Sequence, residues 1–251
     1  METVNVVCLK WGDVYSPDYV NNLYSMIKRN ITLPFRFICL TENSQDIRSE
    51  VEIWPLPEFE EPPWEYAKVC PAWRKLALFK KGLADMKGKV LFLDLDVVVM
   101  SNIDCFFSFS NKLAIIENWY QPGRLVGQAS AICFESGQEE FLLQHYLDNT
   151  LNILKKYRTE QAYITGHLGE GGFDYFPEDW CISFKMHCMP SGISRFFSAK
   201  VTEPKDAKIV VFHGRPNPPD AIKGEWGKAL PWYKKWYKRV KPSAWVAQHW
   251  R

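Results

Sequence analysis

The sequence lacks the patterns that mark membrane-spanning, secreted disulfide-rich and zinc-binding proteins. No stretch approaches the roughly 18 uncharged apolar residues that a transmembrane helix needs. The N-terminal residues lead directly into an apolar segment, Val4–Leu9, without a signal-peptide pattern. The seven cysteines are odd in number, include no Cys-x-x-Cys pair and lie partly in apolar, strand-like segments. This usage predicts free core thiols in a reducing compartment, so we expect a cytoplasmic protein without a zinc site.

A large excess of one charge is also missing from the chain as a whole. The 251 residues include 31 Lys or Arg and 29 Asp or Glu, a net charge of +2. Residues 223–251 hold eight of those bases and one acid, which leaves 23 bases and 28 acids, a net charge of −5, in residues 1–222. We therefore expect a main domain over 1–222 and a basic C-terminal segment over 223–251. This asymmetry favours an anionic partner for the end of the chain and does not indicate a nucleic-acid-binding domain.

One nearly continuous apolar stretch, Val90–Val99, stands out, and it contains two aspartates. Such a run, rich in valine and bounded by Gly88 and Asn102, predicts a central strand that is covered on both faces. With a side-chain period of two, Asp94 and Asp96 are expected to point the same way at the strand end. Two adjacent carboxylates are costly unless a cation lies between them, so the pair predicts a divalent metal site. The alternative, that the carboxylates cap the next turn, explains one aspartate and not the second.

The N-terminal part has the pattern of a nucleotide-binding α/β protein. Val4–Leu9 is expected to be a buried strand, a helix begins near Asp18, and strands follow at Phe35–Leu40 and Val51–Trp54. This order predicts a doubly wound, Rossmann-type sheet with ligands beyond the carboxyl ends of its strands. In the loop after the first strand, an aromatic ring could pack on a nucleobase and a base could face phosphate, or the rings could close the rim of the core. The residues concerned are Lys10, Trp11, Gly12 and Tyr15.

A helix is expected to open at Pro71, because proline is favoured in the first turn. At 100° per residue, Lys75 lies beside the apolar face of this helix and Arg74 points away from it. Both bases stand in the first turn, where the helix dipole disfavours a cation, so we expect an anion to approach and Lys75 to face inward. The residues of the apolar face are Trp73, Leu76, Phe79, Leu83 and Met86.

A lone histidine, His213, follows the last predicted strand of the chain. A histidine at a strand end is more often structural. Here, however, His213 stands at the end of a predicted strand, as Asp94 and Asp96 do, and a neutral imidazole is a suitable ligand for the cation that the two carboxylates need. We therefore expect it to be a metal ligand. The strands predicted in this half are Leu113–Glu117, Ala129–Phe134 and Ile209–Phe212, with helices at Gln138–Asn149 and from Thr159.

Together these residues resemble the metal-dependent glycosyltransferases of the GT-A type, in particular family 8, which includes glycogenin and bacterial galactosyltransferases. The similarity is densest in the helix start Trp73–Leu76, the strand with Asp94-Leu95-Asp96 and the segment Asn102–Phe107. Glycogenin-like chains have a similar Lys-Leu helix start, Asp-x-Asp strand and Asn-Ile-Asp-x-x-Phe sequel. The resemblance extends more loosely from Val4 to about Pro219. The Lys10-Trp11-Gly12 segment, with the Tyr15 that follows it, is also similar to a group of bacterial proteins.

The resemblance implies a GT-A-like α/β domain, with a mixed sheet flanked by helices, that transfers a sugar from a nucleoside-diphosphate sugar. UDP is the expected nucleotide, and a hydroxyl of a glycan or a lipid-linked glycan is the expected acceptor. The implied metal is Mn²⁺ or Mg²⁺, held by Asp94, Asp96 and His213. The implied donor contacts are Lys10, Trp11, Gly12, Tyr15, Arg74, Lys75, Leu95 and Arg215.

Four further residues have implied catalytic roles. Glu160 and Gln161 fall where the family has an Asp-Gln or similar pair near the sugar, with Glu160 longer by one methylene. An inverting enzyme would also need a carboxylate base on the acceptor, for which Glu178 and Asp179 are the candidates.

Two other classes of protein share parts of this pattern. Haloacid-dehalogenase-like phosphatases also follow an apolar strand with Asp-x-Asp, but on the first strand of their domain and with a second acidic cluster later. Here the pair comes only at residue 94, and no Asp-Asp or Gly-Asp-x-x-x-Asp follows it. A non-catalytic nucleotide-sugar-binding protein would keep the aromatic loop but has no need for Asp94, Asp96 and His213 together. The glycosyltransferase hypothesis is therefore preferred.

The basic C-terminal segment alternates bases with aromatic rings. Amphipathic rings and clustered bases suit an anionic membrane surface, so one interpretation is peripheral contact with the inner membrane through residues 223–251, and we also expect the segment to be partly packed. The alternative is that the segment folds back over the main domain and its tryptophans cover core. The rings are Trp226, Trp232, Tyr233, Trp236, Tyr237, Trp245 and Trp250, and the bases between them are Lys228, Lys234, Lys235, Lys238, Arg239 and Lys241.

Overall fold

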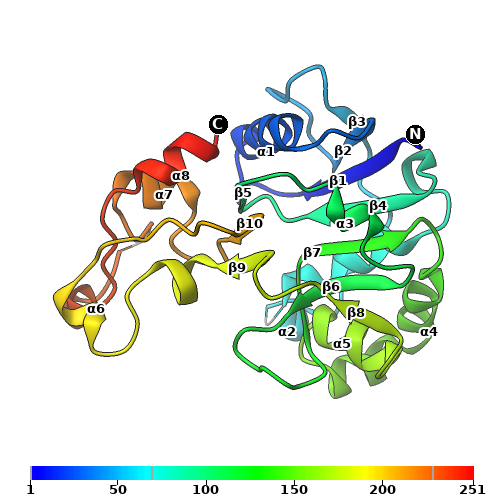
Figure 1. The fold of residues 1–251 in the computed structure, drawn as a ribbon. Helices are drawn as coiled ribbons and strands as arrows, with labels where there is room; N and C mark the ends of the chain where they lie inside the picture. The colour runs from blue at the N-terminus through cyan, green and yellow to red at the C-terminus, as the bar shows by residue number, and fades with distance from the viewer. Residues whose placement is uncertain (1, 69, 228) are drawn as a thin grey trace.

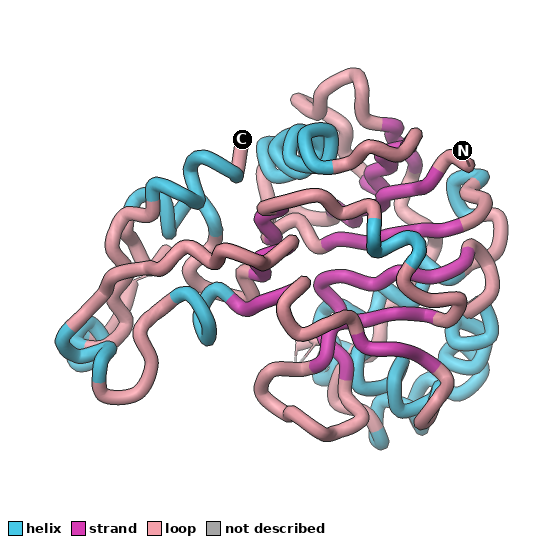
Figure 2. The backbone as a smooth tube through the Cα atoms, in the orientation of Figure 1, coloured by secondary structure: helices cyan, strands magenta, loops and turns pink. Residues whose placement is uncertain are grey.

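The structure is a computed structural model that describes residues 2–68, 70–227 and 229–251, so Lys228 of the basic segment lies outside it. Its larger sheet has the strand order β3-β2-β1-β4-β7-β6-β8 (Figures 1 and 2). The first four of these run parallel, β7 is antiparallel to both of its neighbours, and β8 is parallel to β6. The mixed α/β sheet predicted from the sequence is therefore confirmed. The bounds are β1 Val4–Lys10, β2 Phe35–Thr41, β3 Glu52–Trp54, β4 Lys89–Leu93, β6 Leu113–Glu117, β7 Gly127–Glu135 and β8 Phe173–Tyr175.

Successive side chains of the central strands enter two hydrophobic cores on opposite faces of the sheet. In β1, Val6 and Cys8 pack in the core that contains α1 (Pro17–Asn30), whereas Val7 and Leu9 pack with α4 (Glu140–Lys156) and α5 (Glu160–Leu168). Strands buried on both faces need apolar residues at every position, which explains their continuous apolar runs. The seven cysteines are free thiols and all but Cys105 are buried, which confirms the prediction of core thiols.

The single strand predicted over 90–99 is wrong, because the chain forms two strands there. β4 ends at Leu93, and β5 (Val97–Val99) belongs to a second sheet of order β5-β10-β9, with β9 at Cys181–Ser183 and β10 at Ile209–Val211. β5 leaves the large sheet to pair antiparallel with β10. The two aspartates therefore lie in the turn between the sheets rather than on one pleated strand.

The helix predicted from Pro71 is a 3₁₀ helix, η1 (Pro71–Phe79), which stops before Leu83. Gly82 and Ala84 have φ angles of +74° and +51°, and this left-handed backbone cannot continue a right-handed helix. A separate turn, η2 (Leu83–Asp85), follows. The helix predicted to end at Asn149 kinks at that residue and continues to Lys156 as part of α4.

Apart from β10, the described residues beyond Ser183 form a smaller lobe beside the second sheet, on the left of Figure 1. The end of the basic segment packs against the main body: Trp245 is buried in the core of α1, and the ring of Trp250 lies 5.2 Å from that of Tyr19. The predicted boundary at 222/223 stays a prediction. No described helix is long and apolar enough to cross a membrane. The remaining helices are α2 Trp64–Ala67, α3 Cys105–Ser108, η3 Phe184–Cys188, α6 Ser194–Phe197, α7 Pro218–Lys223, η4 Trp232–Trp236 and α8 Ala244–His249.

A buried carboxyl group should make the stability of this fold depend on pH. Glu139 is 4% exposed, and its Oε2 has no hydrogen-bond partner among the described residues. Burial raises the pKa of Glu139 to about 7 from the usual 4.5. The unfolded state therefore loses its proton first as the pH rises, so the folded state loses stability through the interval between the two values.

We expect Glu139→Gln to remove this effect. Above pH 7 the variant should be more stable than the wild type by about 2–3 kcal/mol, and below the unfolded value the difference should shrink toward zero. Denaturant unfolding across the pH range would measure the difference, with the exposed Glu170→Gln as control. A constant difference at all pH values would contradict a titrating Glu139.

Candidate functional site

A cavity of about 270 Å³ lies at the carboxyl ends of β1 and β4, the parallel pair at the centre of the large sheet. Its walls come from the loop after β1, the first turns of η1 and the turn between β4 and β5. These segments meet because parallel strands end at the same edge of a sheet. The structure thereby brings six of the predicted site residues into one cavity: Trp11, Tyr15, Lys75, Asp94, Leu95 and Asp96.

Lys75 holds Asp94 in place from the side of η1. Its amino group lies 2.7 and 2.9 Å from the two carboxylate oxygens of Asp94 and donates to the Ala129 carbonyl at 3.0 Å. The Ser130 hydroxyl donates a further hydrogen bond to Asp94, at 2.8 Å. Burial lowers the pKa of Lys75, but the charges of Asp94 and Glu160 outweigh it and raise that pKa above its ordinary value. Lys75 is therefore a permanent cation that faces the cavity.

Asp96 is the more deeply buried carboxylate, with 6% of its surface exposed. The Tyr15 hydroxyl donates to its Oδ2 at 2.8 Å. Burial and the neighbouring charge of Asp94 raise the pKa of Asp96 well above its usual range. In the described part of the chain, Asp96 forms no salt bridge, so its short-range partner is a neutral hydroxyl. A second cation beside this carboxylate would relieve the cost of its ionisation.

His213 lies next to this turn along the backbone, but its imidazole points elsewhere. Phe212 N donates to the Asp96 carbonyl at 3.0 Å, which places the end of β10 beside the two aspartates. The Nε2 of His213 instead lies 2.5 Å from Ser183 Oγ, at the end of β9. The ring also stacks on Trp119, with 5.6 Å between centroids. β10 pairs with β5 on one side and with β9 on the other. Ser183 is the last residue of β9, and its hydroxyl is the hydrogen-bond partner of the imidazole nitrogen.

The predicted set of three metal ligands is therefore not formed. Within residues 2–68, 70–227 and 229–251, no three His, Cys, Asp or Glu side chains gather as they would around a metal ion. Burial, with Lys185 and His187 nearby, lowers the pKa of His213 to about 4, so the ring is neutral at neutral pH. What the structure offers a cation is the carboxylate pair of Asp94 and Asp96.

Glu160 and Gln161 open α5 on the far side of Lys75. Glu160 is 4% exposed and accepts a hydrogen bond from the Cys70 thiol, at 2.9 Å from its Oε2. Burial and this carboxylate raise the pKa of Cys70 to about 12, so the thiol stays protonated as the donor. The Oε1 of Gln161 accepts from Ala129 N at 3.1 Å. Both side chains thus support the Lys75–Asp94 pair, and neither lines the cavity.

Four predicted donor contacts do not line this cavity. Arg74 points away from it, as predicted, and its Nε pairs with Glu61 at 2.8 Å. Lys10 is buried at the end of β1 and Arg215 pairs with Asp220 at 2.8 Å, and neither lines the cavity. The fourth, Gly12, makes the turn after β1 with a φ angle of +58°, and its N donates to Glu42.

The acidic loop forms part of a different cavity. Glu178 and Asp179 are exposed, and Glu178 lines a space of about 210 Å³ together with Trp119 and His187. This space adjoins the ring of His213, because Trp119 stacks on that ring. The structure therefore does not bring Glu178 or Asp179 together with the carboxylate pair.

Four residues that matter at the site were not predicted from the sequence. Ser130, Cys70, Trp119 and Lys185 contact Asp94, Glu160 or His213. Ser130 carried a signal, because it is the single polar residue in the apolar segment Ala129–Phe134. The others are brought to the site by contacts over 28 to 90 residues of sequence or by stacking, which no local pattern contains.

The chain is similar in structure to solved galactosyltransferases. It matches an active-site mutant of LgtC with a TM-score of 0.61 and 14% identity, over 92% of this chain and 99% of that chain. It also matches the galactosyltransferase LgtC in complex with donor and acceptor sugar analogues, with a TM-score of 0.58 and 15% identity, over 86% and 89% of the two chains. The sequence matches no protein-family model and no curated protein. The fold is thus GT-A-like, over nearly the whole chain.

Proposed function

We propose that this protein is a glycosyltransferase that moves a hexose from a nucleoside-diphosphate sugar to an acceptor hydroxyl. The observation that supports this most is the cavity at the ends of β1 and β4, which has flat aromatic residues on one wall and a cation between carboxylates on the other. The aromatic wall suits a nucleobase, and the charged wall suits a diphosphate with its metal. The structural similarity to LgtC, solved with donor and acceptor sugar analogues, supports the same conclusion.

The proposed reaction depends on neutralising negative charge on the leaving group. A sugar can leave a nucleoside diphosphate only if the negative charge that develops on the leaving group is neutralised. Lys75 provides a fixed positive charge at the cavity, held by Asp94 and the Ala129 carbonyl. Tyr15 provides a hydroxyl whose pKa is raised by burial and by Asp96, so it remains a hydrogen-bond donor.

The carboxylate pair fits a divalent cation. Carboxylate oxygens are preferred ligands of Mn²⁺ and Mg²⁺, and Mg²⁺ is commonly held by one or two carboxylates together with substrate phosphates. Asp94 and Asp96 would hold the ion, and the buried charge of Asp96 beside that of Asp94 is the observation that favours one. When bound, the cation would neutralise charge on the departing diphosphate. We propose no metal contact for His213 in the arrangement seen, since its Nε2 is bonded to Ser183.

Thermal unfolding with a panel of nucleotide-sugars, each with and without Mn²⁺, tests this proposal. Ligand at about 100 times its Kd should stabilise the folded state by about 2.7 kcal/mol. We expect a UDP-sugar to raise the unfolding temperature, and to raise it more when Mn²⁺ is present. A protein that no nucleotide-sugar stabilises under either condition would not be the proposed enzyme.

The aromatic wall of the cavity leads to a kinetic prediction. Stacking of a base on an aromatic side chain contributes about 1–3 kcal/mol, and it is equal in the ground state and the transition state. Trp11→Ala should therefore raise the donor KM roughly tenfold or more and change kcat much less. Steady-state kinetics would measure both constants, with the exposed Trp64→Ala as control. If the donor KM is unchanged, Trp11 only closes the rim of the core.

We also propose that part of the basic segment contacts an anionic membrane surface. Trp245 is buried, but Trp232, Tyr233 and Trp236 are exposed, and so are Ile193, Phe196 and Phe197 of the same lobe. Exposed large apolar side chains of this number are typical of an interaction surface, and bases lie among them. Trp232→Ala/Trp236→Ala should weaken sedimentation with acidic vesicles about tenfold or more, whereas Trp64→Ala should not. Equal sedimentation of all three proteins would contradict this contact.

A further inference from the structure

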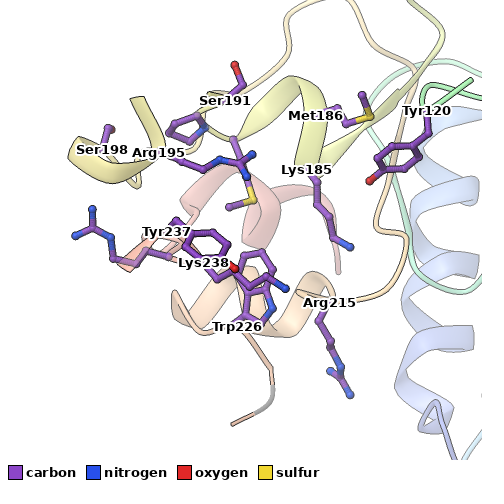
Figure 3. Close-up of a pocket in the computed structure, with 13 residues that line it drawn as sticks. Tyr120, Lys185, Met186, Ser191, Arg195, Ser198, Arg215, Trp226, Tyr237 and Lys238 are labelled. Carbon is purple, nitrogen blue, oxygen red and sulfur yellow. The ribbon is translucent and has the colours of Figure 1, made fainter. Parts of the chain in front are cut away.

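The smaller lobe contains a second cavity, of about 520 Å³, that the proposed donor chemistry does not use. It lies between η3, α6 and the residues Trp226 and Tyr237–Arg239 (Figure 3). Its volume is within the range of small-molecule binding sites in proteins, roughly 300–1,000 Å³. None of its lining residues lines the cavity of Asp94 and Asp96.

The charge of this cavity is of one sign. Among the described residues, five bases line it and no Asp or Glu does: Lys185, Arg195, Arg215, Lys238 and Arg239. Figure 3 shows Lys185 and Arg195 entering from one side and Lys238 from the other. Asp220 pairs with Arg215 from outside the lining, at 2.8 Å. A lining with five bases and no acid among the described residues favours a ligand with more than one negative charge.

Arg195 is the residue that most directly indicates a ligand. Its Nε is fully shielded from solvent and has no hydrogen-bond partner in the described chain. An unsatisfied buried donor on a charged group is costly, and native proteins leave few of them. Arginine is also the side chain best suited to phosphate, because its planar guanidinium donates two parallel hydrogen bonds. An oxyanion in the cavity would satisfy this group.

The position of the cavity relates it to the acceptor rather than to the donor base. Two lining residues reach His213: Lys185 donates to its carbonyl oxygen, and the ring of Tyr120 lies 5.4 Å from the imidazole. His213 follows Phe212, whose N is bonded to Asp96. The cavity therefore begins beside the end of β10, which is bonded to the turn that carries the aspartates, and none of its lining residues belongs to the aromatic loop of Trp11. A ligand in the cavity that extends past His213 would approach Asp96.

We propose that this cavity binds a phosphate ester carried by the acceptor, so that the protein glycosylates a phosphorylated sugar. Arg195 and Lys238 hold the phosphate, and the rings of Trp226 and Tyr237 form the apolar part of the wall. Lys238 lies 5.4 Å from the Trp226 ring, a cation–π contact that keeps its amino group at the cavity. That the phosphate belongs to the acceptor rests on the proposed glycosyl transfer, whereas the phosphate site itself rests on the cavity alone.

The test uses the full-length protein and three variants, Arg195→Gln, Lys238→Gln and the control Lys200→Gln. Lys200 is an exposed base close to α6 that does not line the cavity. Calorimetric titration with glucose phosphate and with glucose measures the phosphate site without any donor. Sedimentation with phosphatidylcholine vesicles, with and without phosphatidic acid, measures binding to a lipid phosphate. Hydrolysis of a nucleotide-sugar without acceptor measures the donor site separately.

We expect glucose phosphate to bind and glucose not to bind. Each of the two cavity variants should weaken the binding of glucose phosphate at least about tenfold, because each loses a charge-assisted hydrogen bond to it. Lys200→Gln should leave this binding unchanged. Donor hydrolysis should be the same in all four proteins. The unfolding temperature of Arg195→Gln should equal or exceed that of the wild type, because the variant removes an unsatisfied buried donor. A merely structural arginine would instead lower it.

Three results would overturn the proposal. Equal binding of glucose phosphate by all four proteins would show that the cavity is not its site. A parallel loss of donor hydrolysis in Arg195→Gln and Lys238→Gln would assign the cavity to the donor diphosphate. If Arg195 and Lys238 are needed only for binding to vesicles that contain phosphatidic acid, the cavity is a lipid headgroup site. If no protein hydrolyses any nucleotide-sugar while Arg195-dependent phosphate binding persists, the glycosyl transfer fails and the phosphate site is still supported.

Discussion

Asp96→Asn should reduce sugar transfer at least about 100-fold while leaving the protein folded. The amide keeps the size of the side chain and can still accept the hydrogen bond of Tyr15, so packing in the turn between β4 and β5 is preserved. What is lost is the negative charge that would hold a divalent cation beside the donor diphosphate. Removal of the cation by a chelator should have an effect of the same size on the wild type.

The measurement is transfer rate with and without Mn²⁺, together with the unfolding temperature. Asp148→Asn, an exposed aspartate on α4, is the matched control and should change neither. Because Asp96 is buried next to Asp94, the neutral variant should be at least as stable as the wild type when no cation is present. Full activity in excess chelator would falsify the metal-dependent reaction.

Lys75→Met should both destabilise the protein and abolish most of its activity. Removing one partner of a buried ion pair leaves the other charge uncompensated, which costs about 3–5 kcal/mol in a fully buried pair. The Asp94 side chain is 24% exposed, so we expect a smaller cost than this, about 2–3 kcal/mol. The loss of a fixed positive charge at the leaving group should lower transfer by a further factor of about 10²–10³.

Two comparisons separate the charge of Lys75 from its packing. The double variant Lys75→Met/Asp94→Asn should be more stable than Lys75→Met, because the second change removes the uncompensated carboxylate. Mn²⁺ should stabilise Lys75→Met more than the wild type, since a divalent cation can replace the missing ammonium group. Lys80→Met, at the exposed end of η1, should behave as the wild type. If the double variant is the less stable of the two, the pair is held by packing rather than by charge.

Local patterns in the sequence predicted most strands of the large sheet and much of the cavity, but not β8. A strand buried on both faces needs an unbroken apolar run, and β1, β2, β6 and β7 were predicted from such runs. Parallel strands place the loops that follow them at one edge, so Trp11, Tyr15, Asp94 and Asp96 could be expected together before any contact was known. The direction of Lys75 followed from helical spacing, because a 3₁₀ helix and an α-helix differ little over its first turn.

The tertiary structure decided what those patterns do not contain. Whether residues 90–99 form one strand or two depends on β10, more than 100 residues later, which pairs with β5 and draws the chain out of the large sheet at the aspartates. The contacts of Asp96 with Tyr15 and of His213 with Ser183 are likewise choices among partners that only folding brings within reach. The sequence by itself determined which side chains are apolar, charged and adjacent along a strand or helix. The basic cavity of Lys185, Arg195 and Lys238 exists only because three segments without a common periodic pattern pack around one space.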